Sequence, residues 1–213
     1  MTPLMRARFG LAAAAIAAAT VFSGDPMAYV VNGPTWSQAQ TPYYVNSANL
    51  DLAGISAETA VRSGADAWQQ QSAAFRFTYS GLSSQTTTTY DGINLVLFRN
   101  ASSGSAIATT YWWTSGSRIV DADIVFWDGA FRFFAGSSGC SGGFYIEDIA
   151  SHEFGHALGL GHSTSTNATM YPSVGSCNMG NRTLDADDIA GVRALYPLQQ
   201  PPPSEPTGFR IIS

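Results

Sequence analysis

The chain has 213 residues, which is long enough for one domain with a sizeable hydrophobic core. Its 15 acidic residues outnumber its 10 basic residues, all of which are arginine, so the formal net charge at pH 7 is -5. Nucleic acids and anionic membrane surfaces would repel such a chain, and we expect neither as a partner.

The first 24 residues are predicted to be a secretory signal peptide and not part of the fold. Arg6 and Arg8 precede an apolar, alanine-rich run over residues 9–21, and small residues offer cleavage sites between positions 19 and 28. The run is shorter than the ~20 residues that a membrane-spanning helix needs, so no membrane anchor is expected. The sequence therefore predicts a secreted, extracellular protein, which we expect to act as a monomer.

Residues 30–198 are predicted to form the one folded domain, with strands and helices in mixed order. Residues 29–40 are polar and contain a Gly33-Pro34 turn, so no element is expected there. Strand propensity and alternation predict strands at residues 42–47, 75–79, 93–98, 107–113 and 118–127, and helical spacing of apolar residues predicts a helix at 56–71. The 93–98 run is almost continuously apolar, which predicts a central strand buried on both sides.

Two further helices are predicted after these strands. Residues 136–143 form a loop rich in glycine and serine, and a helix follows at about 145–158, with Glu147 and Asp148 in its first turn. Asp185 is expected to cap a last helix that ends at Tyr196. Residues 199–213 are predicted to be a proline-rich tail outside the domain.

Residues 152–162, His-Glu-Phe-Gly-His-Ala-Leu-Gly-Leu-Gly-His, contain all three histidines of the chain. His152 and His156 are four residues apart, so on a helix they project from one face and can bind one metal ion. Gly159 can end the helix in a left-handed conformation, which returns the chain so that His162 becomes a third ligand. Three neutral imidazoles with an open fourth position are typical of a catalytic zinc site, because structural zinc sites are closed and usually rich in cysteine.

Glu153 directly follows the first histidine, where the signature H-E-x-x-H places the general base of a zinc protease. The short signature also occurs in helices whose histidines only pack or cap. The long form H-E-x-x-H-x-x-G-x-x-H fixes five positions, which makes a chance match far less probable. We therefore expect one zinc ion with Glu153 beside it.

Cys140 and Cys177 are the only cysteines, and they lie on either side of the histidine motif. In an exported chain an even cysteine count favours a disulfide, and two free buried thiols are the alternative. Neither cysteine is expected to bind zinc, because the three histidines already complete the site.

The segment from His152 to Ser163 resembles the zinc signature of the matrixins, the matrix-metalloproteinase family within the metzincins. Thr169-Met170-Tyr171-Pro172 resembles the family's Met-turn, whose methionine lies beneath the metal, and residues 184–196 resemble its C-terminal helix. The resemblance covers roughly residues 34–197. It implies an α+β, zincin-like fold with a twisted, mostly parallel five-stranded sheet, an antiparallel edge strand, three helices and the Met-turn.

The chain departs from the usual matrixin pattern in two respects. No cysteine precedes Cys140, so we expect no cysteine-switch propeptide of the family's kind, and no histidine is left for a second, structural zinc. Family members often bind calcium near the strand before the active-site helix. Asp121, Asp123 and Asp128 offer oxygen ligands for calcium there, or are simply solvated, and both interpretations stay open.

The resemblance implies a secreted zinc endopeptidase that hydrolyses peptide bonds of protein or peptide substrates, with Glu153 as general base and then general acid. It also implies that residues 107–111 are the sheet edge along which an extended substrate lies. Residues 172–181 would then wall an apolar pocket for the residue after the cut. The alternative is a secreted zinc-containing binding module without catalysis, against which the intact Glu153 argues.

Overall fold

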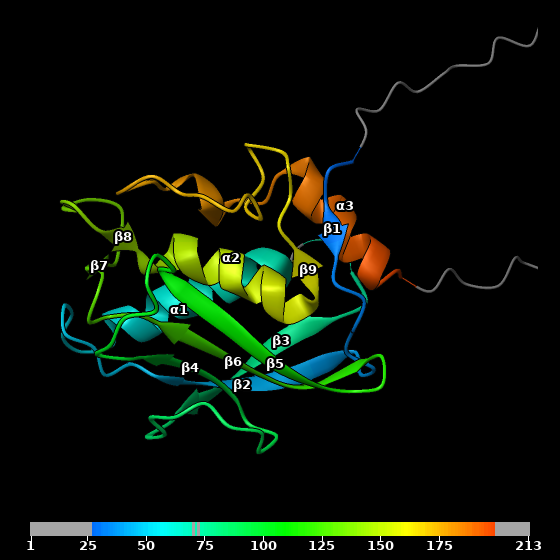
Figure 1. The fold of residues 1–213 in the computed structure, drawn as a ribbon, viewed down its shortest axis with the longest axis horizontal. Helices are drawn as coiled ribbons and strands as arrows, with labels where there is room; N and C mark the ends of the chain where they lie inside the picture. The colour runs from blue at the N-terminus through cyan, green and yellow to red at the C-terminus, as the bar shows by residue number, and fades with distance from the viewer. Residues whose placement is uncertain (1–26, 70, 72, 199–213) are drawn as a thin grey trace, which may run out of the picture.

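The structure is a computed structural model that describes residues 27–69, 71 and 73–198. The predicted signal peptide and the predicted tail lie outside the described residues. A central sheet carries the helices α1 (Ser56–Gln69) and α2 (Ile146–Leu158) on one face, and α3 (Ala186–Leu195) lies at one end, beside the first described strand (Figure 1).

The central sheet has five strands in the order β3-β2-β4-β6-β5. These strands are β2 (Gln40–Asn46), β3 (Arg76–Leu82), β4 (Asn94–Phe98), β5 (Ala108–Ser115) and β6 (Arg118–Phe126). Neighbours run parallel except β5, which pairs antiparallel with β6 at the edge. All five residues of the central β4 are buried, and the predicted α+β fold with its antiparallel edge strand is confirmed.

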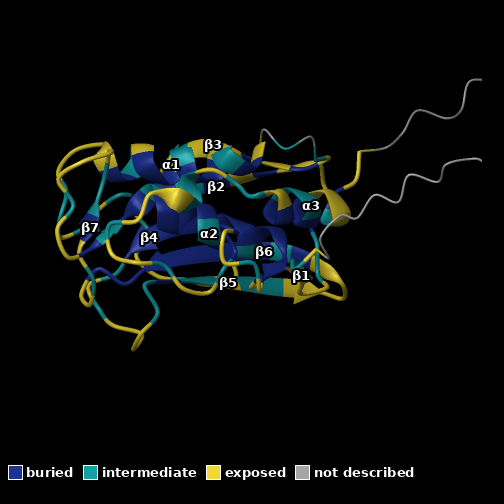
Figure 2. Cartoon of the chain, turned by 90° about the horizontal axis from the view of Figure 1, so that it is seen from above, coloured by how far each residue is buried: buried dark blue, intermediate teal, exposed yellow. Residues whose placement is uncertain are grey.

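The helices α1 and α2 pack unusually closely because small residues face each other. A Cβ on Gly64 of α1 would lie 2.7 Å from the backbone nitrogen of Ser151 in α2. Trp68, one turn further along α1, donates its indole N–H to the Ser151 carbonyl at 2.8 Å. The helix α2 is buried over most of its length (Figure 2). This contact fixes α2, the helix with two of the three histidines, relative to the core.

The segment before the first sheet strand is ordered, which corrects the expectation that residues 29–40 form no element. The strand β1 (Val30–Val31) pairs antiparallel with β9 (Leu160–Gly161), directly after α2. Trp36 is 4% exposed and donates its indole N–H to the Ala157 carbonyl at 2.8 Å. The paired residues are 131 and 129 positions apart along the chain, so their pairing leaves no local pattern and the sequence did not predict it.

Other boundaries moved by a few residues. The predicted strand at 75–79 continues to Leu82, and the strand predicted at 107–113 continues to Ser115. A second small sheet pairs β7 (Phe133–Phe134) with β8 (Phe144–Tyr145), and the 3-10 helix η1 (Gly180–Arg182) precedes α3. Within the described ranges, no helix has the length and apolar character needed to cross a membrane.

Candidate active site

The three histidines meet at one point. The Nε2 atoms of His152 and His156 are 3.1 Å apart, and those of His156 and His162 are 3.2 Å apart. The first two project from neighbouring turns of α2, which ends at Gly159 with φ 103°, a left-handed conformation that returns the chain toward the helix. Among the residues that the structure describes, these three are the one group of histidine, cysteine or acidic side chains placed to hold a metal ion together.

The opposite ring nitrogens of two histidines face backbone carbonyls. His152 Nδ1 lies 2.7 Å from the Thr169 oxygen, and His156 Nδ1 lies 2.8 Å from the Leu160 oxygen. A carbonyl only accepts hydrogen bonds, so each Nδ1 carries the proton and each Nε2 presents a lone pair. Two such lone pairs 3.1 Å apart repel each other unless a cation lies between them. This donor set fits zinc, which takes neutral imidazole nitrogens.

Loss of hydration favours the neutral form of these imidazoles, of which His162 is the most exposed. Desolvation lowers the pKa of His152 and of His156 to about 4, and it also lowers the pKa of His162. At neutral pH all three side chains are therefore uncharged, which is the state in which an imidazole binds a metal.

The carbonyls that orient the histidines are themselves held in place. Asp188, in the first turn of α3, accepts hydrogen bonds from the backbone N–H of Thr169 at 2.7 Å and of Met170 at 3.0 Å. Met170 is 1% exposed and packs under α2, where a Cβ on Gly155 would overlap its sulfur. The predicted Met-turn segment thus lies between α2 and α3, and its Thr169 carbonyl orients His152.

The Leu160 carbonyl is held in place by the first segment that the structure describes. It accepts from His156 Nδ1 and also from the Asn32 side-chain amide, at 3.1 Å. Asp187, next to Asp188 in α3, accepts from the backbone N–H of Ala28 and Tyr29 at 2.6 and 2.9 Å, which fastens the segment that carries Asn32. Because these contacts span 159 and 158 positions, no local pattern in the sequence predicts them for Asp187.

Glu153 lies on α2 between the first two histidines and is 5% exposed. Its Oε2 accepts a hydrogen bond of 2.7 Å from the hydroxyl of Thr110 on β5. Burial raises the pKa of the Glu153 carboxyl, while the neighbouring His156 and the Thr110 hydroxyl act in the opposite direction. Thr110 was not predicted as a site residue, because a threonine in an edge strand carries no motif.

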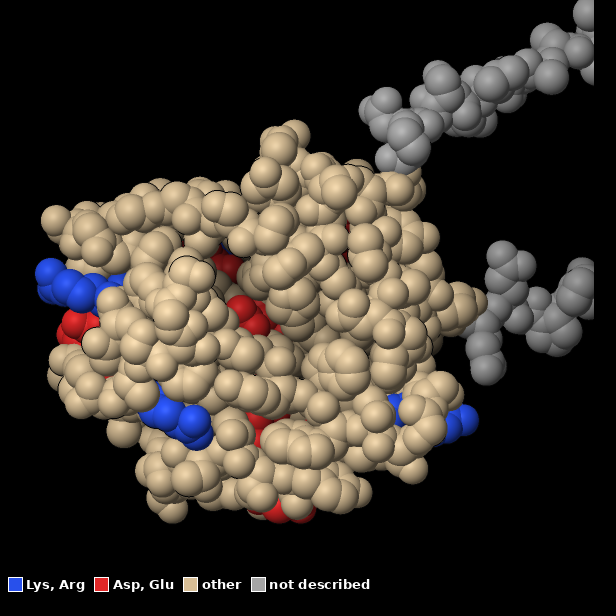
Figure 3. All heavy atoms as spheres, in the orientation of Figure 1, with Lys and Arg blue, Asp and Glu red and all other residues tan. Residues whose placement is uncertain are grey.

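The histidines and Glu153 line a cleft of about 670 Å³ between β5 and the segment after the Met-turn. One side is formed by residues 105–110 and Trp112, and the other side by residues 171–174 and Asn181. Apolar side chains gather at the end away from β1, namely Ile107, Phe131, Phe144, Ile149 and Val174. The surface on this side of the molecule carries few charged groups, and acidic atoms show only within its hollows and at its margins (Figure 3).

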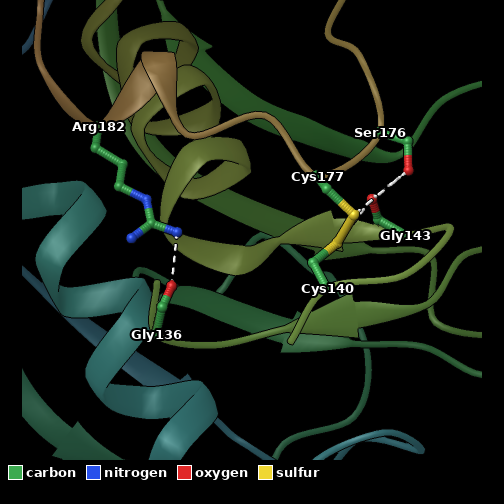
Figure 4. Close-up of a disulfide and its surroundings, with 6 residues drawn as sticks. All are labelled: Gly136, Cys140, Gly143, Ser176, Cys177 and Arg182. Carbon is green, nitrogen blue, oxygen red and sulfur yellow. Dashed lines mark hydrogen bonds between the residues drawn. A yellow bond between two sulfur atoms is a disulfide. The ribbon is translucent and has the colours of Figure 1, made fainter. Parts of the chain in front are cut away.

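The disulfide between Cys140 and Cys177 is present, which confirms the predicted pair and excludes the alternative of two free thiols. It joins the loop before α2 to the segment that walls the cleft (Figure 4). The Gly143 carbonyl reinforces the connection, because it accepts from Cys177 N–H at 2.9 Å and from Ser176 Oγ at 3.0 Å. Neither sulfur belongs to the histidine cluster.

Arg182 fastens the far end of the same wall. Its guanidinium donates to the buried carboxylate of Asp148 at 2.7 Å and to the Gly136 carbonyl at 2.8 Å, and it pairs with Glu147 at 3.2 Å (Figure 4 shows the contact with Gly136). Both acids were predicted only as favourable charges in the first turn of a helix. In the structure both acids share one cationic partner, Arg182.

The three aspartates considered for calcium do not form one group. Asp121 accepts from the backbone N–H of Asp91 and Gly92, both at 2.8 Å. Asp123 accepts from Leu95 at 2.9 Å and from Thr89 at 3.1 Å, so this pair holds down the loop between β3 and β4. Asp128 binds the Leu50 backbone instead, in another part of the fold. Calcium binding at these residues stays a prediction.

Comparison with known proteins agrees with this geometry. The family model described as Matrixin matches residues 35–197. The chain is similar to neutrophil collagenase of Homo sapiens, with 47% identity over 60 residues that cover 28% of this chain and 13% of that protein. It is also similar to matrilysin of Homo sapiens, with 45% identity over 60 residues that cover 28% of this chain and 22% of the relative.

A further relative is matrix metalloproteinase-27 of Tupaia belangeri, with 42% identity over 69 residues, or 32% of this chain and 14% of that protein. The chain thus matches between 13% and 22% of the length of these three relatives. Local similarity of this extent bears on the domain and not on the whole of each larger protein.

Proposed function

Because the chain belongs to the matrixin family, we propose that it is a zinc-dependent endopeptidase that hydrolyses peptide bonds of protein or peptide substrates. The observation that carries the proposal is the meeting of three neutral imidazoles beside one buried carboxylate, at the bottom of a long cleft. The N-terminal apolar segment supports secretion, and we propose that the secreted enzyme acts as a monomer.

His152, His156 and His162 would hold one zinc ion through their Nε2 atoms. When bound there, zinc would supply Lewis acidity that lowers the pKa of water to about 7 and polarises the scissile carbonyl. The Thr169 and Leu160 carbonyls accept hydrogen bonds from Nδ1–H of His152 and His156 and so hold the tautomer whose Nε2 is free, and no rotation or proton loss of these two rings is needed when the ion binds. Met170 packs beneath this helix and would support the site from below.

Glu153 is proposed as the proton carrier. Its carboxylate would take a proton from the attacking water and deliver it to the nitrogen of the leaving amine, a role worth about 10²–10⁴ in rate. The side chain is buried at the wall of the cleft, so bulk water does not compete for the proton. Replacing it therefore affects chemistry more than binding.

The strand β5 is proposed as the substrate platform. It lies at the edge of the sheet, so an extended peptide can add itself as a further strand through main-chain hydrogen bonds. The side chain after the cut would enter the apolar end of the cleft, beside Ile149 and Val174. We propose that this pocket prefers an apolar side chain, because the described residues that line that end are uncharged.

A non-catalytic zinc-binding module is the competing function. The two are separated by incubating the purified protein with casein and with a peptide library, with and without a chelator. An endopeptidase cleaves both, loses activity with the chelator and regains it with added zinc. Zinc-loaded protein that cleaves neither substrate would support the binding module instead.

A further inference from the structure

We propose that Thr110 is a positioning residue, which holds the Glu153 carboxylate in the orientation that proton transfer requires. This inference rests on the function proposed above, in which Glu153 carries the proton. Thr110 itself would act through Glu153 and would contribute no proton to the reaction.

The first observation is the hydrogen bond. Thr110 Oγ1 lies 2.7 Å from Glu153 Oε2 and 3.0 Å from the backbone oxygen of the same residue. A hydroxyl has one proton to donate, and an ionised carboxylate oxygen is the stronger acceptor and the nearer one here. The contact occupies Oε2 and leaves Oε1 to exchange protons with the reactants.

The second observation is that the strand register fixes this contact. Thr110 pairs with Ile124 of β6, and side chains along a strand alternate between faces. The adjacent Thr109 therefore faces the other side, where its hydroxyl accepts the indole N–H of Trp127 at 2.9 Å. Eight paired positions between β5 and β6 set this register and so hold the Thr110 hydroxyl in place.

The third observation is burial. Glu153 is 5% exposed, so the water that could replace a lost donor has little access to its carboxylate. A buried carboxylate oxygen without a donor is unfavourable, and the side chain would turn about its flexible bonds to find another partner. Displacement of a reacting group by about 1 Å can lower a rate about a hundredfold. The hydroxyl of Thr110 thus keeps the proton carrier aligned between turnovers.

The test compares Thr110→Val with Thr110→Ser in the zinc-loaded protein. Valine keeps the shape and removes the donor, whereas serine keeps the donor. We expect Thr110→Val to lower kcat about tenfold to a hundredfold with KM changed less than about threefold, and Thr110→Ser to retain most of kcat. Thr114→Val is the matched control, because Thr114 is an exposed residue at the far end of the same strand and outside the cleft.

Two further measurements separate positioning from a general effect on the fold. Zinc content and melting temperature of each variant should stay close to those of the wild type, and a crystal structure of Thr110→Val should show the Glu153 carboxylate rotated. Wild-type kcat in Thr110→Val, or loss of kcat in Thr110→Ser equal to that in Thr110→Val, would overturn the inference. If Thr110→Val does not fold, Thr110→Ser against Thr110→Ala in the same assay decides the question.

The outcomes also distinguish this inference from the proposed function. A zinc-loaded wild type without peptidase activity would overturn the proposed function itself. An active wild type, an inactive Glu153→Gln variant and a fully active Thr110→Val variant would leave the function standing and remove only the role of Thr110.

Discussion

At the residue scale, the site is built in two tiers. The carbonyls of Thr169 and Leu160 orient two imidazoles. Asp188 in turn accepts a hydrogen bond from the backbone N–H of Thr169, and the side-chain amide of Asn32 donates one to the Leu160 carbonyl. Such outer partners set the tautomer and the direction of a metal ligand, and their loss typically costs 10–100-fold in metal affinity or activity. The ligand geometry is therefore a property of the surrounding hydrogen bonds as much as of the three histidines.

The first prediction concerns Glu153. Glu153→Ala should bind zinc with the wild-type stoichiometry but lose peptidase activity by about 10²–10⁴, because only the proton carrier is removed. Metal analysis and turnover of a fluorogenic peptide measure the two effects in one preparation. Turnover at the wild-type rate in this variant would exclude Glu153 from the mechanism.

The second prediction concerns Gly155. A methyl group there would overlap the sulfur of Met170 and would lie 2.7 Å from the ring of Trp68, so Gly155→Ala must push the helix and the Met-turn apart. We expect the free energy of unfolding to fall by about 1–3 kcal/mol, as for other overpacked cores, and zinc affinity to fall with it. Urea denaturation and chelator competition measure the two quantities.

Gly175→Ala is the control for this substitution. The space around Gly175 is open to 4 Å, so the same added methyl group should leave unfolding and zinc affinity unchanged. Equal stability of Gly155→Ala and Gly175→Ala would contradict the tight packing beneath the site.

At the element scale, the wall of the cleft is fastened at two points. The disulfide joins it to the loop before α2, and Arg182 joins η1 to the first turn of α2. The described residues 171–179 of this wall have no helix or strand. The wall keeps its place through its attachments and not through secondary structure of its own.

The third prediction follows from the disulfide. The double variant Cys140→Ser/Cys177→Ser should lose about 3–4 kcal/mol of stability in the chain-entropy model, because the bridge closes a loop of 37 residues. It should keep its zinc, because neither sulfur lies in the histidine cluster. Melting curves and metal analysis test both statements. A reducing agent should lower the melting temperature of the wild type and leave that of the double variant unchanged.

The sequence predicted those elements whose signal is local. The apolar run of β4, the acidic first turn of α2 and the Asp185 cap of α3 each lie within one segment. The structure contains all three, including a capping box between Asp185 and Asp188. The histidine motif is equally local, so its residues could be named before their geometry was known.

What the sequence did not predict depends on contacts between distant segments. The pairing of β1 with β9 involves two residues on each side, and the hydrogen bond from Thr110 to Glu153 spans 43 positions. Neither a pair of valines nor a threonine in a strand carries a local sequence signal that identifies its distant partner. Only the register of β5 and the position of α2 give Thr110 its place beside the carboxylate.

At the scale of the whole molecule, the three histidines form the one candidate metal site among the described residues. The fourth prediction is that the purified protein contains one zinc per chain, because the described residues bring only the three histidines together as a metal-binding group. Removal of zinc should abolish activity and lower the melting temperature, since a ligand that binds only the folded state stabilises it. Reconstitution should restore both. A reproducible stoichiometry near two would show that carboxylates form a second site.

The contacts of the first described segment set the order in which a new chain can become a working catalyst. Asn32 supports the carbonyl behind His156 across 128 positions, and Asp187 fastens Ala28 across 159. A chain emerging from a ribosome or a translocation pore therefore has Asn32 and its histidines before it has Asp187 and Asp188, which hold the supporting segments in place. The last helix must arrive and join the first strand before the site is complete. Hydrolytic activity would thus be timed by synthesis itself, and the machinery that makes and moves the chain is exposed to it only after the domain has closed.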